Sequence, residues 1–394
     1  MARTDTLGNF LTDIANAIRN KKGTTDTIVA SDFDTEIESI ESGGSSGDTS
    51  AEDGLITRTL TEYSNNRVTE VGKYAFYNLT ILQSIDLPNV TNIKDSAFQS
   101  CTSLTSINLP KATNIGLDAI RNCASLTSIN LPELTDLGSY AFYSCTSLSS
   151  IILPKLITVG TSSFHNCTSL PSIDLPNVTI IGSSCFYGCR LLSSINLPNA
   201  TTIGTSCFYG CMSLPSIDLP KVTSIGNNSF YNCQSLESVN LPNITTIGTS
   251  CFYSNLKLLS ADFQNITSIP ANTFYNCQSL KSVNLPNVTS VEASSFRLCA
   301  SLELLDLPKV TKINGTYCFR ESNSLITLIL RSETMCTLSN TNAFQTSPIA
   351  SGTGYIYVPS ALIDSYKTAS NWSTYANQFR AIEDYPEICG ETTA

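Results

Sequence analysis

Cysteine is the residue type whose spacing first suggests chemistry. The sequence has 15 cysteines, and nine of them share one register, separated by 22 residues or a multiple of 22: Cys101, Cys123, Cys145, Cys167, Cys189, Cys211, Cys233, Cys277 and Cys299. Thiols on adjacent turns could bind a metal ion or form disulfides. However, the same register also holds Leu79 and Asn255, and no Cys-x-x-Cys pair is present. We therefore predict buried, reduced thiols that pack in a turn, with no metal and no cofactor.

Enzymatic chemistry finds little support in the sequence. His165 is the only histidine, and its register otherwise holds Tyr, Gln or Arg. No nucleophile elbow, phosphate-binding loop or histidine-rich metal motif accompanies it. We expect a protein that is not an enzyme and has no catalytic residue.

Two outward registers are candidates for binding. One follows a periodic phenylalanine and contains Tyr143, His165, Tyr187, Tyr209, Tyr231, Tyr253 and Tyr275. The other alternates acid and amide: Asp174, Asn196, Asp218, Asn240, Asp262, Asn284 and Asp306. An amide between two carboxylates can donate to both, so we expect the second row to be satisfied internally. The tyrosines are either a self-stacking stripe or a recognition platform, and we assign ligand binding to them, with the Asp/Asn row as the alternative face.

The element that positions these rows is a 22-residue repeat, which predicts a solenoid. Leu104, Ile107 and Leu109 follow the pattern LxxLxL, in which alternate residues of a short strand point inward. Pro110 ends that strand because proline has no N–H for a neighbouring strand. We expect about twelve stacked coils of mostly parallel β structure with short turns.

Four segments are expected. Residues 1–41 form a small helical anchoring module, because Leu7, Phe10, Leu11, Ile14, Ile18, Phe33 and Ile37 recur at helical spacing. Residues 42–54 are a flexible Gly/Ser/acidic linker, residues 55–330 the solenoid, and residues 331–394 an α/β C-terminal cap and tail.

Charge and hydropathy exclude two classes of partner. The formal net charge is −10, and no basic block or long apolar run is present. We therefore expect neither nucleic-acid binding nor membrane insertion. The N-terminal residues contain acids and amides where a secretory signal has an apolar core, so we expect synthesis in a reducing cytoplasm.

The repeated unit CxSLxSIxLPxxTxIGxxxF resembles the BspA-type leucine-rich repeats of bacterial surface proteins, over about residues 55–385. YIYVPSALIDSYKTASNWSTYANQFRAI is similar to the segment that closes such arrays, and LGNFLTDIANAIRNKKGTTDTIVASDFDTEIESI resembles short N-terminal segments of phage and prophage tail-associated proteins. These resemblances imply a leucine-rich-repeat solenoid and a non-enzymatic receptor-binding protein of a phage or phage-like tail, located in the virion after synthesis in the host.

The implied partners follow from the two ends of the chain. A tail or baseplate protein would bind the N-terminal module, which could also form a homo-oligomer, and a bacterial surface polysaccharide or protein would bind the solenoid. The alternative is a BspA-like adhesin on the bacterial surface that binds a host protein or another cell.

Overall fold

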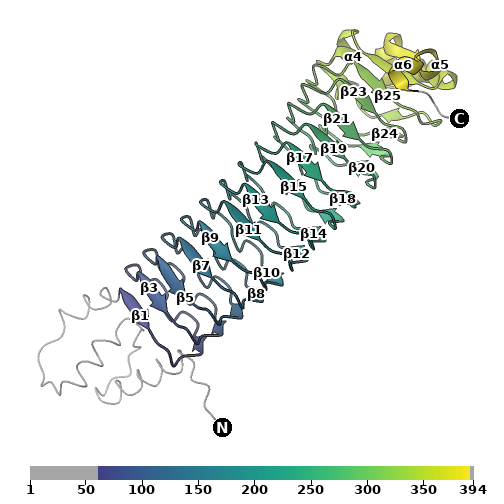
Figure 1. Ribbon diagram of the computed structural model, residues 1–394. Coiled ribbons are helices and arrows are strands. Elements are labelled where there is room, and N and C mark those ends of the chain that lie inside the picture. The colour runs from purple at the N-terminus through teal and green to yellow at the C-terminus, as the bar shows by residue number, and fades with distance from the viewer. Residues whose placement is uncertain (1–60, 391–394) are drawn as a thin grey trace, which may run out of the picture. The chain divides into compact units, whose positions relative to one another are not determined.

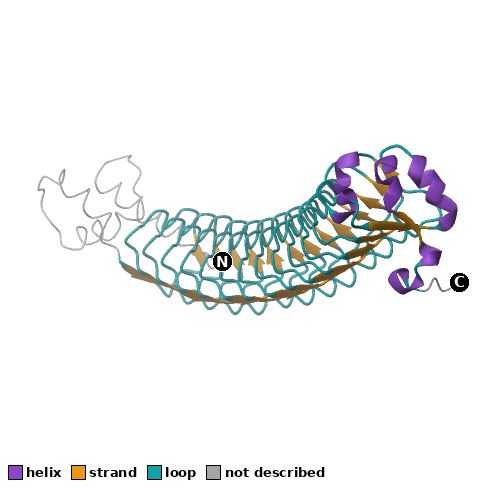
Figure 2. Ribbon diagram, turned by 90° about the horizontal axis from the view of Figure 1, so that it is seen from above, coloured by secondary structure: helices purple, strands orange, loops and turns teal. Residues whose placement is uncertain are grey.

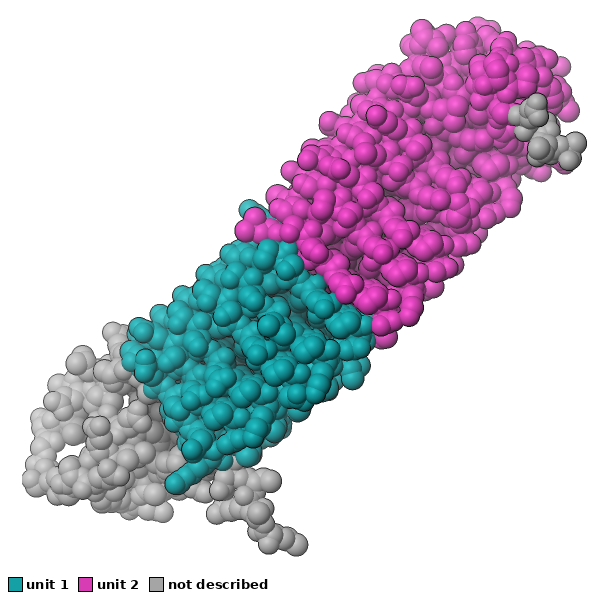
Figure 3. All heavy atoms as spheres, in the orientation of Figure 1, with its two compact units in different colours: residues 1–178, 188–190 teal, residues 179–187, 191–394 magenta. Residues whose placement is uncertain are grey.

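The computed structural model describes residues 61–390. The predicted anchoring module and linker, including Leu7, Phe10, Leu11, Ile14, Ile18, Phe33 and Ile37, lie outside these residues. The chain divides into two compact units, residues 1–178 with 188–190 and residues 179–187 with 191–394 (Figure 3). The division falls inside the repeat array, so each unit contains a series of complete coils.

Each coil contributes one three-residue strand and one two-residue strand (Figure 1). The longer strands are β1 (Glu62–Ser64), β3 (Ser84–Asp86), β5 (Ser106–Asn108), β7 (Ser128–Asn130), β9 (Ser150–Ile152), β11 (Ser172–Asp174), β13 (Ser194–Asn196), β15 (Ser216–Asp218), β17 (Ser238–Asn240), β19 (Ser260–Asp262), β21 (Ser282–Asn284), β23 (Leu304–Asp306) and β25 (Thr327–Ile329). The shorter strands are β2 (Glu70–Val71), β4 (Asn92–Ile93), β6 (Asn114–Ile115), β8 (Asp136–Leu137), β10 (Thr158–Val159), β12 (Ile180–Ile181), β14 (Thr202–Ile203), β16 (Ser224–Ile225), β18 (Thr246–Ile247), β20 (Ser268–Ile269), β22 (Ser290–Val291), β24 (Lys312–Ile313) and β26 (Thr337–Leu338).

Strands of successive coils pair in parallel, in a register that follows the repeat. In the first unit β2, β4, β6, β8 and β10 pair in this order, and in the second unit β12, β14, β16 and β18 pair in the same way. Within the second unit the longer strands β15 and β17 pair with Asp218 opposite Asn240, and β19 and β21 pair with Asp262 opposite Asn284. Residues 22 positions apart therefore lie side by side, and the fold is a parallel β-solenoid.

The inward residues of the repeat form a continuous core within each unit. The central residue of most longer strands, the leucine of each Leu-Pro pair and the periodic phenylalanine are buried. In the second unit Phe208, Phe230 and Phe252 stack nearly parallel, with ring centroids 5.2 and 5.5 Å apart. Leu197 is 1% exposed, which confirms its predicted inward position.

A third series of hydrogen bonds joins the coils beside the periodic phenylalanine. The backbone N–H groups of Asn228, Phe230 and Asn232 donate to carbonyls of the next coil at 2.9, 2.9 and 2.7 Å. Asn228 and Asn232 adopt left-handed φ angles of 56° and 59°, and Ser, Asn or Gly occupies the equivalent sites of most other coils. These residue types adopt the left-handed region with less strain than branched residues do. The arc from 228 to 232 is thereby held in register with its neighbours.

The parallel ladder continues beyond residue 330. β27 (Tyr355–Val358) pairs with β25, and β28 (Phe379–Ala381) pairs with β27, so the described residues contain fifteen longer-strand rungs and not about twelve. The predicted C-terminal cap therefore supplies two rungs of its own.

Short helices gather around these last rungs (Figure 2): η2 (Thr341–Phe344), α4 (Pro348–Ser351), η3 (Ser360–Leu362), α5 (Ile363–Thr368), η4 (Trp372–Gln378), η5 (Ile382–Asp384) and α6 (Pro386–Cys389). The side chains of Tyr366, Trp372 and Phe379 are buried there against one another. Among the residues from 61 to 390, no helix is long and apolar enough to cross a membrane.

Candidate functional site

The cysteine register is structural. All 15 cysteines are buried. Each thiol at the repeat position donates to a carbonyl 25 residues earlier, which belongs to a phenylalanine in every case but that of Cys145, whose acceptor is Ile120; Cys233 donates to Phe208 at 3.1 Å. Burial raises the pKa of Cys233 to about 12, so the thiol stays protonated and unreactive near neutral pH. The prediction that these thiols are buried is confirmed, and among the described residues no cluster suited to a metal ion occurs.

The sequence suggested that small side-chain size alone explains the cysteine register. The structure shows that hydrogen bonding matters as well. Asn255 donates its amide to the Phe230 carbonyl at 3.0 Å and accepts from the Cys233 N–H at 2.9 Å. Ser322 stands at the same place near the C-terminus and donates to the Phe296 carbonyl. Thiol, amide and hydroxyl share a donor group, so from Cys101 to Ser322 the position holds a small side chain that can donate a hydrogen bond, and Leu79, near the start of the array, is the exception.

The tyrosine register forms an ordered stack in the second unit. We call Tyr187, Tyr209, Tyr231, Tyr253 and Tyr275 the tyrosine stripe. Successive ring centroids lie 4.4–4.6 Å apart, and the ring planes differ by 3–8°. The rings are half-buried. The backbone fixes this spacing, because the carbonyl of each tyrosine from Tyr231 to Tyr275 accepts an N–H from the preceding coil at 2.7–2.8 Å.

The stack closes the ring faces. Both faces of Tyr209, Tyr231 and Tyr253 lie against neighbouring rings, and the Arg297 guanidinium lies 5.3 Å from the centre of the Tyr275 ring. The stripe therefore presents ring edges and hydroxyl groups outward. Burial, followed by the neighbouring tyrosine hydroxyls, raises the pKa of Tyr253 to about 12, so this hydroxyl stays neutral at physiological pH.

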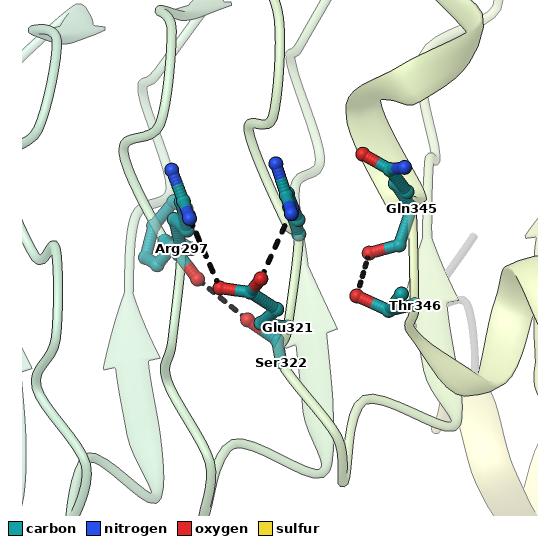
Figure 4. Close-up of polar contacts among 7 residues, drawn as sticks. Arg297, Glu321, Ser322, Gln345 and Thr346 are labelled. Carbon is teal, nitrogen blue, oxygen red and sulfur yellow. Dashed lines mark hydrogen bonds and ion pairs between the residues drawn. The ribbon is translucent and has the colours of Figure 1, made fainter.

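Charged side chains end the stripe. Arg297 donates through Nε and Nη2 to Glu321, both at 3.2 Å, and the Arg320 Nε lies 3.1 Å from another oxygen of Glu321 (Figure 4). Arg320 also lies over the Tyr317 ring at 4.8 Å. Two guanidinium groups share one carboxylate, which leaves this end of the stripe with net positive charge.

The first unit contains a shorter version of the same row. Tyr143 and His165 stack at 4.5 Å, and the Arg121 guanidinium lies 4.7 Å from the Tyr143 ring centre. His165 thus takes the place of a tyrosine, as the sequence predicted.

The acid and amide register is more exposed. The outward residues of β15, β17, β19 and β21 form a surface that we call the strand face: Ser216, Asp218, Ser238, Asn240, Ser260, Asp262, Ser282 and Asn284, all of which are exposed. Asp174 and Asn196 are exposed too, whereas Asp306 is half-buried and is held by Arg331.

The acids of the strand face are only partly satisfied. Asn240 donates to Oδ1 of Asp218 at 2.7 Å, and Asn284 donates to Oδ1 of Asp262 at 3.1 Å. Each amide therefore bonds one acid of the preceding coil, and the expectation that it bridges two acids is wrong here. The Oδ2 atoms of Asp218 and Asp262 accept no hydrogen bond from any residue that the structure describes, so they can accept from a ligand.

Comparison with known proteins agrees with this architecture. The fold is that of a leucine-rich-repeat protein. The BspA type leucine-rich repeat region matches in six copies at residues 59–148, 135–259 and 245–363, and the chain belongs to this family. No curated protein matches the sequence.

A solved structure shows the same fold. A leucine-rich repeat protein from Bacteroides ovatus is 27% identical over 80% of this chain and 88% of its own, with a TM-score of 0.65. A leucine-rich cell surface protein from Faecalibacterium prausnitzii is 26% identical over 71% of this chain and 80% of its own, with a TM-score of 0.43.

Proposed function

We propose that this chain is a non-enzymatic adhesin-type module exposed on the bacterial surface, and that its strand face binds an extended, polyhydroxylated polymer such as a cell-surface polysaccharide. Membership of the BspA-type repeat family supports the adhesin role. The tail-protein alternative, with its virion location, depends on residues 1–41, which lie outside the described residues.

The open carboxylate oxygens of Asp218 and Asp262 are the observation that supports the strand face. These two exposed acids recur two coils apart, and exposed serine hydroxyls flank them on every rung. A sugar hydroxyl can donate to a carboxylate and accept from a serine or an amide. One such bond is worth only about 0.5–1.5 kcal/mol, so a useful affinity requires a ligand that spans several rungs.

The tyrosine stripe is less suited to the same ligand. Sugars pack their apolar C–H groups against aromatic ring faces, and those faces are closed within the stack. We keep the tyrosine register as the competing assignment for this ligand: Tyr143, His165, Tyr187, Tyr209, Tyr231, Tyr253 and Tyr275.

The test measures binding to arrayed neutral polysaccharides, with periodate-treated copies whose vicinal diols have been cleaved. The variant Asp218→Asn/Asp262→Asn removes both open carboxylates and keeps side-chain size. The control Asp364→Asn/Asp384→Asn removes the same charge from exposed residues near the C-terminus. We expect the strand-face variant to lose about 10-fold or more in affinity while the control binds normally.

Two results would decide against this surface. Unchanged binding of the strand-face variant would overturn the proposal. Loss of binding only in Tyr209→Ser/Tyr231→Ser/Tyr253→Ser would move the ligand site to the tyrosine row. Equal binding to the periodate-treated arrays would exclude a polysaccharide and point to a protein partner.

A further inference from the structure

We propose that the tyrosine stripe is a docking surface for a second copy of this chain, which lies antiparallel to the first and forms a twofold-symmetric dimer. This inference is independent of the polysaccharide proposal, because it concerns a different surface and a different partner. It also differs from self-association through residues 1–41.

Spacing is the first argument for a second copy. The stripe repeats every 4.4–4.6 Å over five coils, and a backbone hydrogen-bond ladder makes that repeat rigid. A partner makes the same contact at every rung only if it has the same repeat. Another solenoid has this repeat by construction, as do the stacked strands of cross-β assemblies, whose spacing is about 4.7–4.8 Å.

Charge is the second argument. The chain has a formal net charge of −10, so two copies repel unless they meet through a neutral surface. The tyrosine stripe carries no charge between Tyr187 and Tyr275, and its neighbours in the turn are short: Ser206, Gly210, Asn228, Asn232, Ser250, Ser254, Asn272 and Asn276. The strand face, by contrast, would place acids against acids.

The positive end of the stripe determines the orientation. In a parallel pair, the Arg297 and Arg320 guanidinium groups of both copies would lie together, with only the Glu321 carboxylate of each copy to compensate them. An antiparallel pair places these clusters at opposite ends of the interface, which avoids the repulsion. The antiparallel arrangement is therefore favoured.

The contact chemistry follows from the closed ring faces. Ring edges and hydroxyl groups point outward, so two stripes meet edge to edge and their hydroxyls exchange hydrogen bonds. A twofold axis through Tyr231 pairs this residue with its own copy. The same axis pairs Tyr209 with Tyr253 of the second copy, and Tyr187 with Tyr275.

Single cysteine substitutions test this register. Tyr231→Cys should form a disulfide with its own copy under mild oxidation. Tyr187→Cys should not, because four rungs separate the two copies of residue 187 from each other, a distance on the order of 19 Å. A mixture of Tyr187→Cys and Tyr275→Cys should cross-link. The native thiols do not interfere, since burial raises the pKa of Cys189 and Cys233 to about 12.

Charge variants at the axis residue provide a second test. Light scattering should give the full-length chain a molar mass of twice 42.5 kDa. Tyr231→Glu and Tyr231→Lys each place like charges at the axis, so each variant alone should be monomeric. An equimolar mixture of the two should recover the dimer, because the paired charges are then opposite.

Three outcomes would overturn the proposal. They are a monomeric wild-type chain at tens of micromolar, a dimer that survives in both charge variants, and self-cross-linking of Tyr187→Cys with none at Tyr231→Cys. The second outcome would return self-association to residues 1–41, and the third would indicate a different register.

Discussion

Asn255 offers a direct test of why cysteine recurs in this solenoid. It is fully buried and replaces a thiol in the series, and it makes hydrogen bonds to the Phe230 carbonyl and the Cys233 N–H at 3.0 and 2.9 Å. Asn255→Val fills a similar space but removes the donor and the acceptor. A lost buried hydrogen bond costs about 1 kcal/mol when the partner finds a replacement, and up to about 3 kcal/mol when it does not.

Asn255→Cys should behave differently. The thiol can donate to the Phe230 carbonyl, and the Cys233 N–H can turn to that same carbonyl, as the Cys211 N–H does to the Phe208 carbonyl at 3.1 Å. We expect the cysteine variant to lie within about 0.5 kcal/mol of the wild type and the valine variant to be destabilised by about 1–3 kcal/mol. Asn255→Ser should also be tolerated, since Ser322 makes the equivalent bond.

The assay is urea unfolding followed by circular dichroism, with all variants compared at one protein concentration. The order of the unfolding midpoints is the decisive result: cysteine and serine variants near the wild type, and the valine variant below them. Equal midpoints for valine and cysteine would refute the donor requirement and return the position to a simple preference for small side chains.

Three further predictions follow from the coil geometry. Gly226→Ala should lower stability by about 1–3 kcal/mol, because the added Cβ would lie 2.6 Å from the backbone nitrogen of Thr205. Gly210 lies in open space at φ +70°, so Gly210→Asn should change stability by about 0.5 kcal/mol or less. Calorimetry of both variants checks this prediction. A thiol reagent at pH 7.5 should label no native cysteine in the folded chain, since burial raises the pKa of Cys145, Cys233 and Cys277 to about 12; labelling before unfolding would contradict these positions. The free energy of unfolding should not depend on these thiols below about pH 8.5, and it should fall as pH rises toward 12, because the thiols of the unfolded chain ionise first. Each thiol contributes a loss of up to about 1.4 kcal/mol per pH unit. Urea midpoints that do not fall above pH 9 would contradict this prediction.

The inward half of the fold could be predicted from the sequence. The 22-residue period places each leucine, isoleucine and phenylalanine in a fixed register, and a buried position admits few side chains. Leu197 and Phe230 are buried as predicted. The two rungs of the C-terminal segment were not predicted as part of the ladder, because β27 and β28 are separated from their neighbours by helical insertions that hide the period.

The hydrogen-bonding role of the cysteine register had a signal that the sequence analysis did not use. Asn255 is a poor substitute for cysteine by hydrophobicity, but both side chains can donate. Its Phe230 acceptor lies 25 residues earlier, which is not the repeat length, so the pairing becomes visible only when the coils are stacked. The left-handed residues Asn228 and Asn232 were missed for a related reason, since Ser, Asn and Gly alternate there and look like ordinary turn residues.

The two outward registers show the limit of reasoning from residue type. Tyrosine suggests a binding platform, and alternating Asp and Asn suggest internal satisfaction. Stacking changes how both rows are interpreted, because a tyrosine on every rung is covered by its own neighbours, while an amide on every second rung bonds only one of its two neighbouring acids. A register of identical side chains presents a closed row, which is suited to another row with the same repeat. A register of two alternating types retains unsatisfied atoms at Asp218 and Asp262, and those atoms are what a foreign polymer can use.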